Sequence, residues 1–355
     1  MSQVNSLEIE KKSDIKKGKQ GILLINLGTP DNCTTSDIRK YLAEFLWDYR
    51  VIDINTIGRF LLLNLIILPT RPQKILPSYK QIWLKEGSPL LVYSKNVLKL
   101  MKEKLSDDYY VDLGMRYGNP SINAALERMK AEGVSSIKVI PLYPQYASAS
   151  NASTIEKVME ELKTWQNIPS VNFISYFYDN PKFIQAFADI GKKYLEKETY
   201  DHILFSFHGI PERQISKGDN FNSCNFSSCC EKITSKNQFC YRAQCFQTAY
   251  LIAEKLGLSK DKFSISFQSR LGKTPWIKPY TDVFLEDFAK KGGKKILVFA
   301  PSFVSDCLET VYEIGHEYNE LVKKFGGEKV QLVESLNDHP LWIEALEDII
   351  LNSKY

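Results

Sequence analysis

The sequence predicts an α/β protein with two similar Rossmann-like domains, each built on a four-stranded parallel sheet flanked by helices. Eight short runs rich in Ile, Leu and Val alternate with helical stretches along the 355 residues. Helical stretches such as 122–133 end close to a glycine that can cap them. Alternation of this kind favours parallel sheets that are covered on both faces. The runs also fall into two sets of four that match in order, which predicts an internal duplication.

The expected strands are named here in chain order. The first set is GILLINL (21–27), YYVDLGMRY (109–117), IKVIPLY (137–143) and NFISYF (172–177). The second set is HILFSFH (202–208), FSISFQSR (263–270), KILVFAP (295–301) and KVQLVESL (329–336). The first run of each set is followed by Gly-x-Pro, and the second by a glycine with a proline two or three residues later. The matching glycine and proline residues after the strands support two copies of one structural unit.

The runs also set the expected domain boundaries. Residues 19–185 form the N-terminal domain, with an apolar lip at about 57–75. Residues 186–338 form the C-terminal domain, with a cysteine-rich insert at about 217–245. We expect residues 339–355 to form a C-terminal helix that packs back on the first domain.

Composition excludes several classes of function. Residues 1–18 are polar and lysine-rich without an apolar core, which predicts a disordered tail rather than a signal peptide. The formal net charge is only +4, and no basic aromatic stripe appears, so we expect no nucleic-acid partner. Neither half carries GxGxxG or a P-loop, so we expect no nucleotide. A cytoplasmic location follows.

The most apolar stretch is FLLLNLIIL, residues 60–68. Nine residues cannot cross a hydrocarbon core, which needs about 20 helical residues. Two interpretations stay open: a buried helix, or an exposed apolar lip that touches a membrane surface and is flanked by Arg59 and Arg71. The second would place the protein peripherally at the inner membrane.

His208 is the first candidate for chemistry. It ends an apolar run, and a lone histidine in that position is more often a packing residue. In parallel sheets, however, ligands bind beyond the carboxyl ends of the strands. His208 sits at such an end, in register with Leu27 of the first half. Its position therefore favours a site residue.

A row of carboxylates follows the third run of the second half. A helix is expected to begin near Ser305 or Asp306, which are fair N-cap residues. Glu309, Glu313 and Glu317 then fall at i, i+4 and i+8 on one face. Such a row is commonly a solvated stripe. Its start at the same sheet edge as His208 favours a site that moves protons or a divalent cation.

The remaining candidates are aromatic or cationic. Aromatic side chains near the strand ends could wall a large flat pocket, although each is individually more often core: Trp276, Tyr143, Tyr146 and Phe303. Arg116 ends a strand of the first half, where it would be a costly buried cation unless it is paired or faces a ligand carboxylate.

Eight separate stretches, in order, give the sequence a recognisable signature. They are LINLGTPD, EGSPLLVYSK, GMRYGNPSI, PLYPQYASAS, FSFHGIPER, YRAQCFQTA, SFQSRLGKTPWIKPYTD and PSFVSDCLETVYEI. Over about residues 20–350, the chain resembles the ferrochelatases, which insert ferrous iron into a porphyrin to end haem synthesis. The resemblance implies two Rossmann-like domains with a deep cleft between them and an apolar lip on the first.

The resemblance also implies roles for individual residues, with Fe²⁺ and a porphyrin as substrates. His208 matches the histidine of the family, Glu309 matches the glutamate across the macrocycle, and Glu313 continues the acidic path. Leu27 stands where coproporphyrin enzymes place a tyrosine, which favours protoporphyrin IX. Ser148 is a porphyrin-binding candidate in PQYASASNAST, which departs slightly from the usual PQYSxST run of the family.

Three alternative functions remain open at this point. A coproporphyrin III ferrochelatase differs only in its substrate. A cobalt or nickel tetrapyrrole chelatase would be expected to carry additional metal-binding histidines, and this chain has four histidines in all. A haem or porphyrin carrier without turnover would need no proton acceptor. We make no prediction of oligomeric state.

Five of the seven cysteines gather in the insert. They are Cys224, Cys229, Cys230, Cys240 and Cys245. Their spacing, C-x4-C-C-x9-C-x4-C, lacks the C-x2-C pair of a zinc ribbon. Since some ferrochelatases carry a 2Fe–2S cluster, the candidate cluster ligands are Cys224, Cys229 or Cys230, Cys240 and Cys245, and one of the five would be a spectator. A structural zinc site and free thiols are the alternatives.

Overall fold

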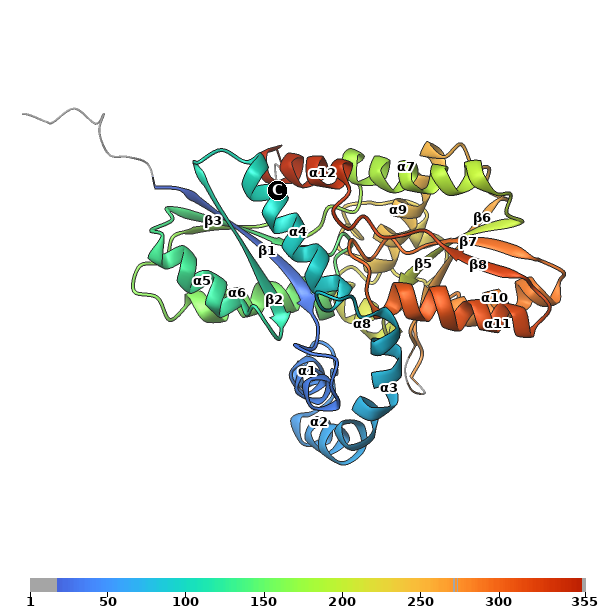
Figure 1. Ribbon diagram of the computed structural model, residues 1–355, viewed down its shortest axis with the longest axis horizontal. Coiled ribbons are helices and arrows are strands. Elements are labelled where there is room, and N and C mark those ends of the chain that lie inside the picture. The colour runs from blue at the N-terminus through green and yellow to red at the C-terminus, as the bar shows by residue number, and fades with distance from the viewer. Residues whose placement is uncertain (1–17, 271, 273, 353–355) are drawn as a thin grey trace, which may run out of the picture.

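Two parallel four-stranded sheets organise the protein (Figure 1). The computed structural model describes residues 18–352 except positions 271 and 273. The first sheet has the order β2-β1-β3-β4, with strands β1 (Gln20–Gly28), β2 (Tyr109–Tyr117), β3 (Ser136–Pro141) and β4 (Ser170–Phe173). The second has the order β6-β5-β7-β8, with strands β5 (His202–His208), β6 (Phe263–Gln268), β7 (Lys295–Phe299) and β8 (Lys329–Leu332). The predicted fold class is confirmed, because both sheets are parallel and repeat one strand order.

The predicted strands 172–177 and 329–336 are too long at their carboxyl ends. In both halves the fourth strand lies at the sheet edge, and its last paired residue is Phe173 in β4 and Leu332 in β8. The chain then leaves the sheet, yet Ile174 and Val333 remain buried. Their apolar character therefore serves packing of the core rather than strand pairing.

Helices cover both sheets. Those of the first half are α1 (Thr35–Trp47), α2 (Thr56–Leu61), α3 (Leu68–Ile82), α4 (Pro89–Lys104), α5 (Ile122–Ala131) and α6 (Ser153–Leu162). They are followed by α7 (Pro181–Lys197), α8 (Glu212–Gly218), α9 (Tyr241–Lys255), α10 (Thr281–Lys290), α11 (Asn319–Lys324) and α12 (Pro340–Asn352). Side-chain caps mark several starts: Ser121 accepts from the amide of Ala124 at α5, and Asn180 accepts from that of Phe183 at α7.

Four further helices in the described part of the chain have other hydrogen-bond patterns. Three are π-helices, namely η1 (Leu62–Ile67), η2 (Ser148–Ala152) and η4 (Leu308–Tyr318), and one is a 3₁₀-helix, η3 (Ser228–Cys230). The π-helices η2 and η4 each follow the third strand of a half. Because π-helices are rare and frequently occur at functional sites, these two segments indicate a functional site at the carboxyl ends of the strands.

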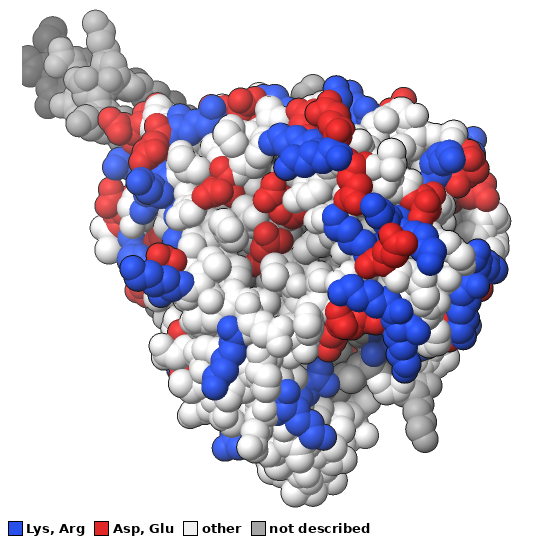
Figure 2. Space-filling view, turned by 45° about the vertical axis from the view of Figure 1, so that its right-hand side comes forward, with Lys and Arg blue, Asp and Glu red and all other residues white. Residues whose placement is uncertain are grey.

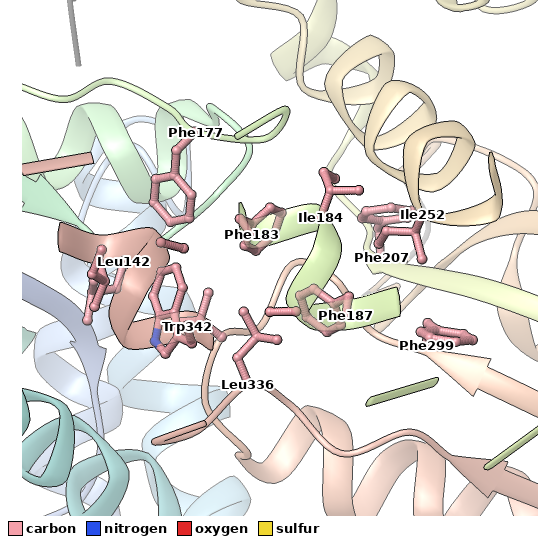
Figure 3. Packing of buried hydrophobic residues seen from close by; sticks show 14 of the residues in the cluster. Leu142, Phe177, Phe183, Ile184, Phe187, Phe207, Ile252, Phe299, Leu336 and Trp342 are labelled. Carbon is pink, nitrogen blue, oxygen red and sulfur yellow. The ribbon is translucent and has the colours of Figure 1, made fainter. Parts of the chain in front are cut away.

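One hydrophobic core joins the two halves (Figure 3). Trp342 of α12 is fully buried, and its ring lies 5.7 Å from that of Phe177 and 6.1 Å from that of Phe183. Helix α12 packs against α7 and α4, and in Figure 1 it lies between the two sheets. The boundary predicted after residue 185 falls inside α7. Of the predicted tail 1–18, residues 1–17 lie outside the described residues.

Helices α1 to α3, with η1, form a lobe that projects from the rest of the molecule (Figure 1). The interpretation of 60–68 as a buried helix is wrong for most of its side chains, because Leu65 is 70% and Ile66 61% exposed, whereas Leu63 is buried. In Figure 2 the lower end of the molecule is largely white with scattered Lys and Arg. Among the described residues, no helix combines the length and apolar character needed to span a bilayer.

Candidate active site at the carboxyl edge of the second sheet

His208 is the last residue of β5, and it is half-buried. Its Nδ1 lies 2.6 Å from the carbonyl oxygen of Gly209. Since a carbonyl oxygen only accepts hydrogen bonds, Nδ1 must carry the proton of the neutral ring. The lone pair of Nε2 is then available as a proton acceptor. The sequence places a histidine here, and the local geometry selects its tautomer.

Two aromatic side chains flank the imidazole. The ring centroids of Trp276 and Phe303 lie 6.4 Å and 6.3 Å from that of His208. The backbone of the Trp276 segment is joined to the chain that follows His208, because the amide of Ile277 donates to the carbonyl of Ile210 at 3.0 Å. Of the four aromatic residues predicted to line the pocket, Trp276 and Phe303 therefore lie beside the histidine.

The carboxylates lie on η4, whose form differs from the expected helix. We predicted a start at Ser305 or Asp306, and the π-helix begins at Leu308 with Cys307 as its N-cap. The carboxylate of Asp306 is used elsewhere, since it accepts from Thr310 Oγ1 at 3.2 Å and from Asn337 Nδ2 at 2.8 Å. A cap assignment based on residue type alone misses these competing partners.

Gln268 connects the histidine strand to the carboxylate helix. It is paired with His208 in the β5–β6 register and is only 1% exposed. Its Nε2 donates to the backbone oxygen of Glu309 at 2.8 Å and to Oε2 of Glu313 at 3.2 Å. Its Oε1 accepts from the hydroxyl of Ser206 at 2.7 Å. Gln268 therefore ties the backbone of Glu309 and the carboxylate of Glu313 to the strand that pairs with His208.

Further contacts distinguish the three carboxylates. The Glu313 side chain accepts from Ser269 Oγ at 2.5 Å and from the Tyr318 hydroxyl at 2.7 Å. Burial, with the charge of Glu313 as a second cause, raises the pKa of Glu317. Glu313 is thus held by hydrogen bonds and is half-buried, whereas Glu317 is exposed, so the row is solvated at its far end only.

Glu309 faces the lobe of the first half. Burial raises the pKa of Tyr79 and of Tyr41 well above the ordinary phenol range, and the negative charge of Glu309 contributes to both shifts. Tyr41 lies on α1 and Tyr79 on α3, so two buried phenols of the lobe approach this carboxylate. The first and second halves thus meet at Glu309.

Leu27 and Arg116 come from the first sheet. Leu27 is half-buried in an apolar cluster that also contains Val311 and Tyr312 of η4. Arg116 is paired: its Nη2 lies 2.6 Å from Oδ2 of Asp48, and its guanidinium stacks on the ring of Tyr117. Sequence reasoning missed Asp48, because nothing in its loop indicates a partner 68 residues away.

Three candidates lie on the segment that follows β3. The amide of Tyr146 donates to Oε1 of Gln244 at 2.6 Å, and Ser148 Oγ accepts from Nη1 of Arg50 at 3.0 Å. Tyr143 keeps its hydroxyl in the interior, and burial raises its pKa. Tyr146 therefore lies at the interface between the halves, since Gln244 lies on α9 of the second half, whereas the Ser148 partner Arg50 belongs to the first half.

Four of the insert cysteines converge. The Sγ atom of Cys229 lies 4.0 Å from that of Cys224 and 3.8 Å from that of Cys230. A hydrogen bond with Cys230, together with amides at the start of α9, lowers the pKa of the Cys240 thiol. Cys245 is fully buried on α9, and burial raises its pKa well above the usual value. Cys245 differs from the other four in lying inside α9.

The thiols of this cluster also have a cationic neighbour. Nη1 of Arg242 donates to Sγ of Cys230 at 2.9 Å. All seven cysteines are free in the structure. Within the described residues, no three His, Cys, Asp or Glu side chains are arranged to hold a single metal ion.

Comparison with known proteins agrees with this geometry. The family model for Ferrochelatase matches residues 19–354. A Ferrochelatase of Legionella pneumophila (strain Lens) is 48% identical over 332 residues, which is 94% of this chain and 98% of that protein. A Ferrochelatase of Coxiella burnetii (strain Dugway 5J108-111) is 43% identical over 329 residues, covering 92% of each.

Solved structures show the same fold at low sequence identity. SirB from Bacillus subtilis with Fe³⁺ matches with a TM-score of 0.54 and 12% identity, over 95% of this chain and 97% of that one. The sirohydrochlorin chelatase SirB from Bacillus subtilis subspecies spizizenii in complex with cobalt matches with a TM-score of 0.51 and 11% identity, over 93% of each chain. The fold, the family model and the close relatives agree: this chain belongs to the ferrochelatase family.

Proposed function

We propose that His208 and Glu309 carry the insertion of Fe²⁺ into protoporphyrin IX, the protohaem-forming reaction of this family of metal chelatases. One observation carries the assignment. Gln268 pairs with His208 in the sheet and donates to the backbone oxygen of Glu309 and to the carboxylate of Glu313, so the helix that carries both glutamates begins at the edge where His208 lies. In parallel sheets this is the edge at which ligands bind.

The proton balance of the reaction assigns a task to each group. A free-base porphyrin loses two pyrrole protons as Fe²⁺ enters, so the products are haem and two protons. The lone pair of His208 Nε2 accepts a proton from one face of the ring. Glu309 and Glu313 lead protons or the incoming metal along the other side. The coproporphyrin and cobalt or nickel alternatives are not favoured by the relatives named above.

The walls of the proposed porphyrin site come from both halves. Trp276 and Phe303 flank His208, while Leu27 packs with η4 on the opposite side. Tyr143, Tyr146 and Ser148 complete the wall on the segment after β3. Contacts of this kind can bend the macrocycle and expose a nitrogen lone pair. Arg116, whose charge Asp48 already balances, would support this wall rather than bind a free carboxylate.

The insert cysteines fit a 2Fe–2S cluster in their chemistry. Cys224, Cys229, Cys230 and Cys240 converge, and the Arg242 guanidinium offsets thiolate charge beside Cys230. These four would hold the cluster, with Cys245 as the spectator. A bound cluster supplies a cross-link between segments of the insert and a one-electron couple that iron insertion does not need. The test is the visible spectrum of freshly purified protein, in which sulfur-to-iron charge-transfer bands are expected.

The exposed lobe supports a peripheral membrane contact of a cytoplasmic enzyme. Ile57, Phe60, Leu65 and Ile66 are exposed together on α2 and η1. Such a surface suits the shallow interface of a bilayer. We expect Leu65→Glu to reduce co-sedimentation with anionic phospholipid vesicles. Ile168→Glu, which changes an exposed apolar residue outside the lobe, should not.

The central experiment is an anaerobic assay with Fe²⁺ and protoporphyrin IX, monitored by haem absorption. Multiple turnovers are expected. A stoichiometric spectral change without turnover would instead indicate a carrier. Faster turnover of coproporphyrin III than of protoporphyrin IX would overturn the substrate assignment. A preference for Co²⁺ or Ni²⁺ over Fe²⁺ would overturn the choice of metal.

A further inference from the structure

The main chain of His208 extends beyond its neighbouring strand. Pairing between β5 and β7 ends at Phe205 and Phe299. Continued in the same register, His208 lies opposite Ser302, which is already outside β7. The hydrogen bonds that a strand would supply on this side of His208 must therefore come from elsewhere, since buried backbone groups are normally paired.

A closed ring of hydrogen bonds takes their place. The hydroxyl of Tyr241 donates to the carbonyl of His208 at 2.7 Å. That hydroxyl lies 3.2 Å from Oγ of Ser302, and the amide of His208 donates to the same Oγ at 3.4 Å. Because the single Tyr241 proton goes to the carbonyl, Ser302 must donate to Tyr241. Both backbone polar groups of His208 are thus held on this side.

The peptide unit that follows His208 is held from two sides. Tyr241 holds its carbonyl oxygen, and its N–H, which belongs to Gly209, donates to the carbonyl of Gln268 at 2.9 Å. A Cβ at Gly209 would lie 2.8 Å from that same carbonyl oxygen, so the position is restricted to glycine. Gly209 also supplies the carbonyl that selects the His208 tautomer. A shift of this peptide would therefore change the direction of Nε2.

Tyr241 is suited to a permanent donor role. It is the first residue of α9 and is buried. The carbonyl oxygen of His208 can only accept, so the Tyr241 hydroxyl is the donor in this contact. Tyr241 does not need to contact the porphyrin, because its hydroxyl acts on the imidazole through the backbone of His208.

From this geometry we propose that Tyr241 is a positioning residue for iron insertion, whose hydroxyl fixes the His208–Gly209 peptide and so aims Nε2 at the porphyrin. The proposal rests on the role assigned to His208 above. It assigns a function to the first turn of α9, which the sequence marks only as part of the stretch YRAQCFQTA.

The test compares Tyr241→Phe with wild type and with Tyr250→Phe. Tyr250 lies on the same helix and packs its ring against Phe246 and Phe263, so it controls for loss of a phenol hydroxyl. We expect Tyr241→Phe to lower kcat about tenfold, the size of one lost hydrogen bond, while KM for protoporphyrin stays within twofold. Tyr250→Phe should match wild type.

A spectroscopic readout separates positioning from general destabilisation. With four histidines in the chain, ¹⁵N NMR of the imidazoles is tractable, and His208→Ala identifies the signal of interest. Wild type should show Nδ1 protonated at His208, and Tyr241→Phe should show a mixture of both tautomers. Ser302→Ala removes another member of the same ring of hydrogen bonds, so it should give the same mixture of His208 tautomers. The double variant should lose no more kcat than the worse of the two single variants.

The possible results are distinguishable. Wild type without turnover would contradict the proposed function itself. A wild type that turns over, with Tyr241→Phe unchanged in kcat and tautomer, would overturn only the positioning role. If Tyr241→Phe does not fold, an unchanged tautomer and kcat in Ser302→Ala overturn the proposal in its place.

Discussion

The two halves of the molecule share one architecture but carry different chemistry at matching positions. Their sheets have the same strand order, and in each half a π-helix follows the third strand. After the first strand, however, Leu27 of one half corresponds to His208 of the other. The strand beside it ends in Arg116 and Tyr117 in the first half, and in Gln268 in the second.

The two π-helices differ in the same direction. The first, η2, carries small polar residues, and its Asn151 is used inside the protein to accept from Ala147 and donate to Tyr143. The second, η4, carries Glu309 and Glu313. A duplicated fold therefore supplies two equivalent edges, of which one ends in Leu27 and a paired arginine and the other in His208 and the glutamates of η4.

The largest effect is expected where the halves differ most. His208→Ala removes the proposed proton acceptor, and turnover should fall by about 10²–10⁴-fold. Leu27→Ala, at the matching position, should raise KM for protoporphyrin and leave kcat within about threefold, because it changes only apolar contact. Steady-state haem formation measures both. Equal losses of kcat in the two variants would show that the halves share the chemistry.

Removing a negative charge should lower kcat at Glu309 of η4 but not at the exposed Glu320. Glu309→Gln keeps the side-chain size but removes the carboxylate, so kcat should fall by about 10²-fold. Glu320→Gln is the matched control, because Glu320 lies on α11, where it forms an exposed ion pair with Lys323. A similar loss in both would indicate that the acidic residues act through the general field of the protein.

The cysteine insert belongs to the second half alone, and its residues should differ among themselves. Cys224→Ser should abolish sulfur-to-iron absorption bands, because its thiol belongs to the converging set. Cys245→Ser should keep the bands, since this cysteine is a fully buried residue of α9 and is the proposed spectator. Visible absorption of the freshly purified variants measures this. Bands lost in Cys245→Ser and retained in Cys224→Ser would reverse the ligand assignment.

The smallest effect is expected at the opposite edge of the second sheet. Hydrogen bonds from Lys295 and Lys329, at the starts of β7 and β8, lower the pKa of Glu198 from its usual 4.5 to about 2. A lowered folded pKa stabilises the fold above the unfolded pKa, and this stabilisation is lost as the pH falls towards 2. Glu198→Gln should therefore lower the urea midpoint at pH 7, with a difference from wild type that shrinks between pH 5 and pH 2.

The same Glu198 variant separates the two edges of the sheet. Its kcat should equal that of wild type, because the substitution lies at the amino ends of the strands and the proposed site lies at their carboxyl ends. A kcat loss larger than about twofold would mean that the chemistry is not confined to one edge.

The succession of strands along the chain, the repeat and the place of His208 at the end of a strand follow from local patterns in the sequence. Apolar runs and the glycine and proline residues that follow them are short-range signals, so they can be recognised without a structure. The π form of 308–318, the pairing of Arg116 with Asp48 and the support of His208 by Tyr241 depend on contacts between distant segments. Residue type alone contains no information about such partners.

The most direct test of the account is a crystal structure of the protein with protoporphyrin IX bound. We predict that the macrocycle lies between the two groups, with Nε2 of His208 facing one side of the ring and the carboxylate of Glu309 facing the other. A porphyrin bound with both groups on the same side, or outside the edge that these residues share, would contradict it.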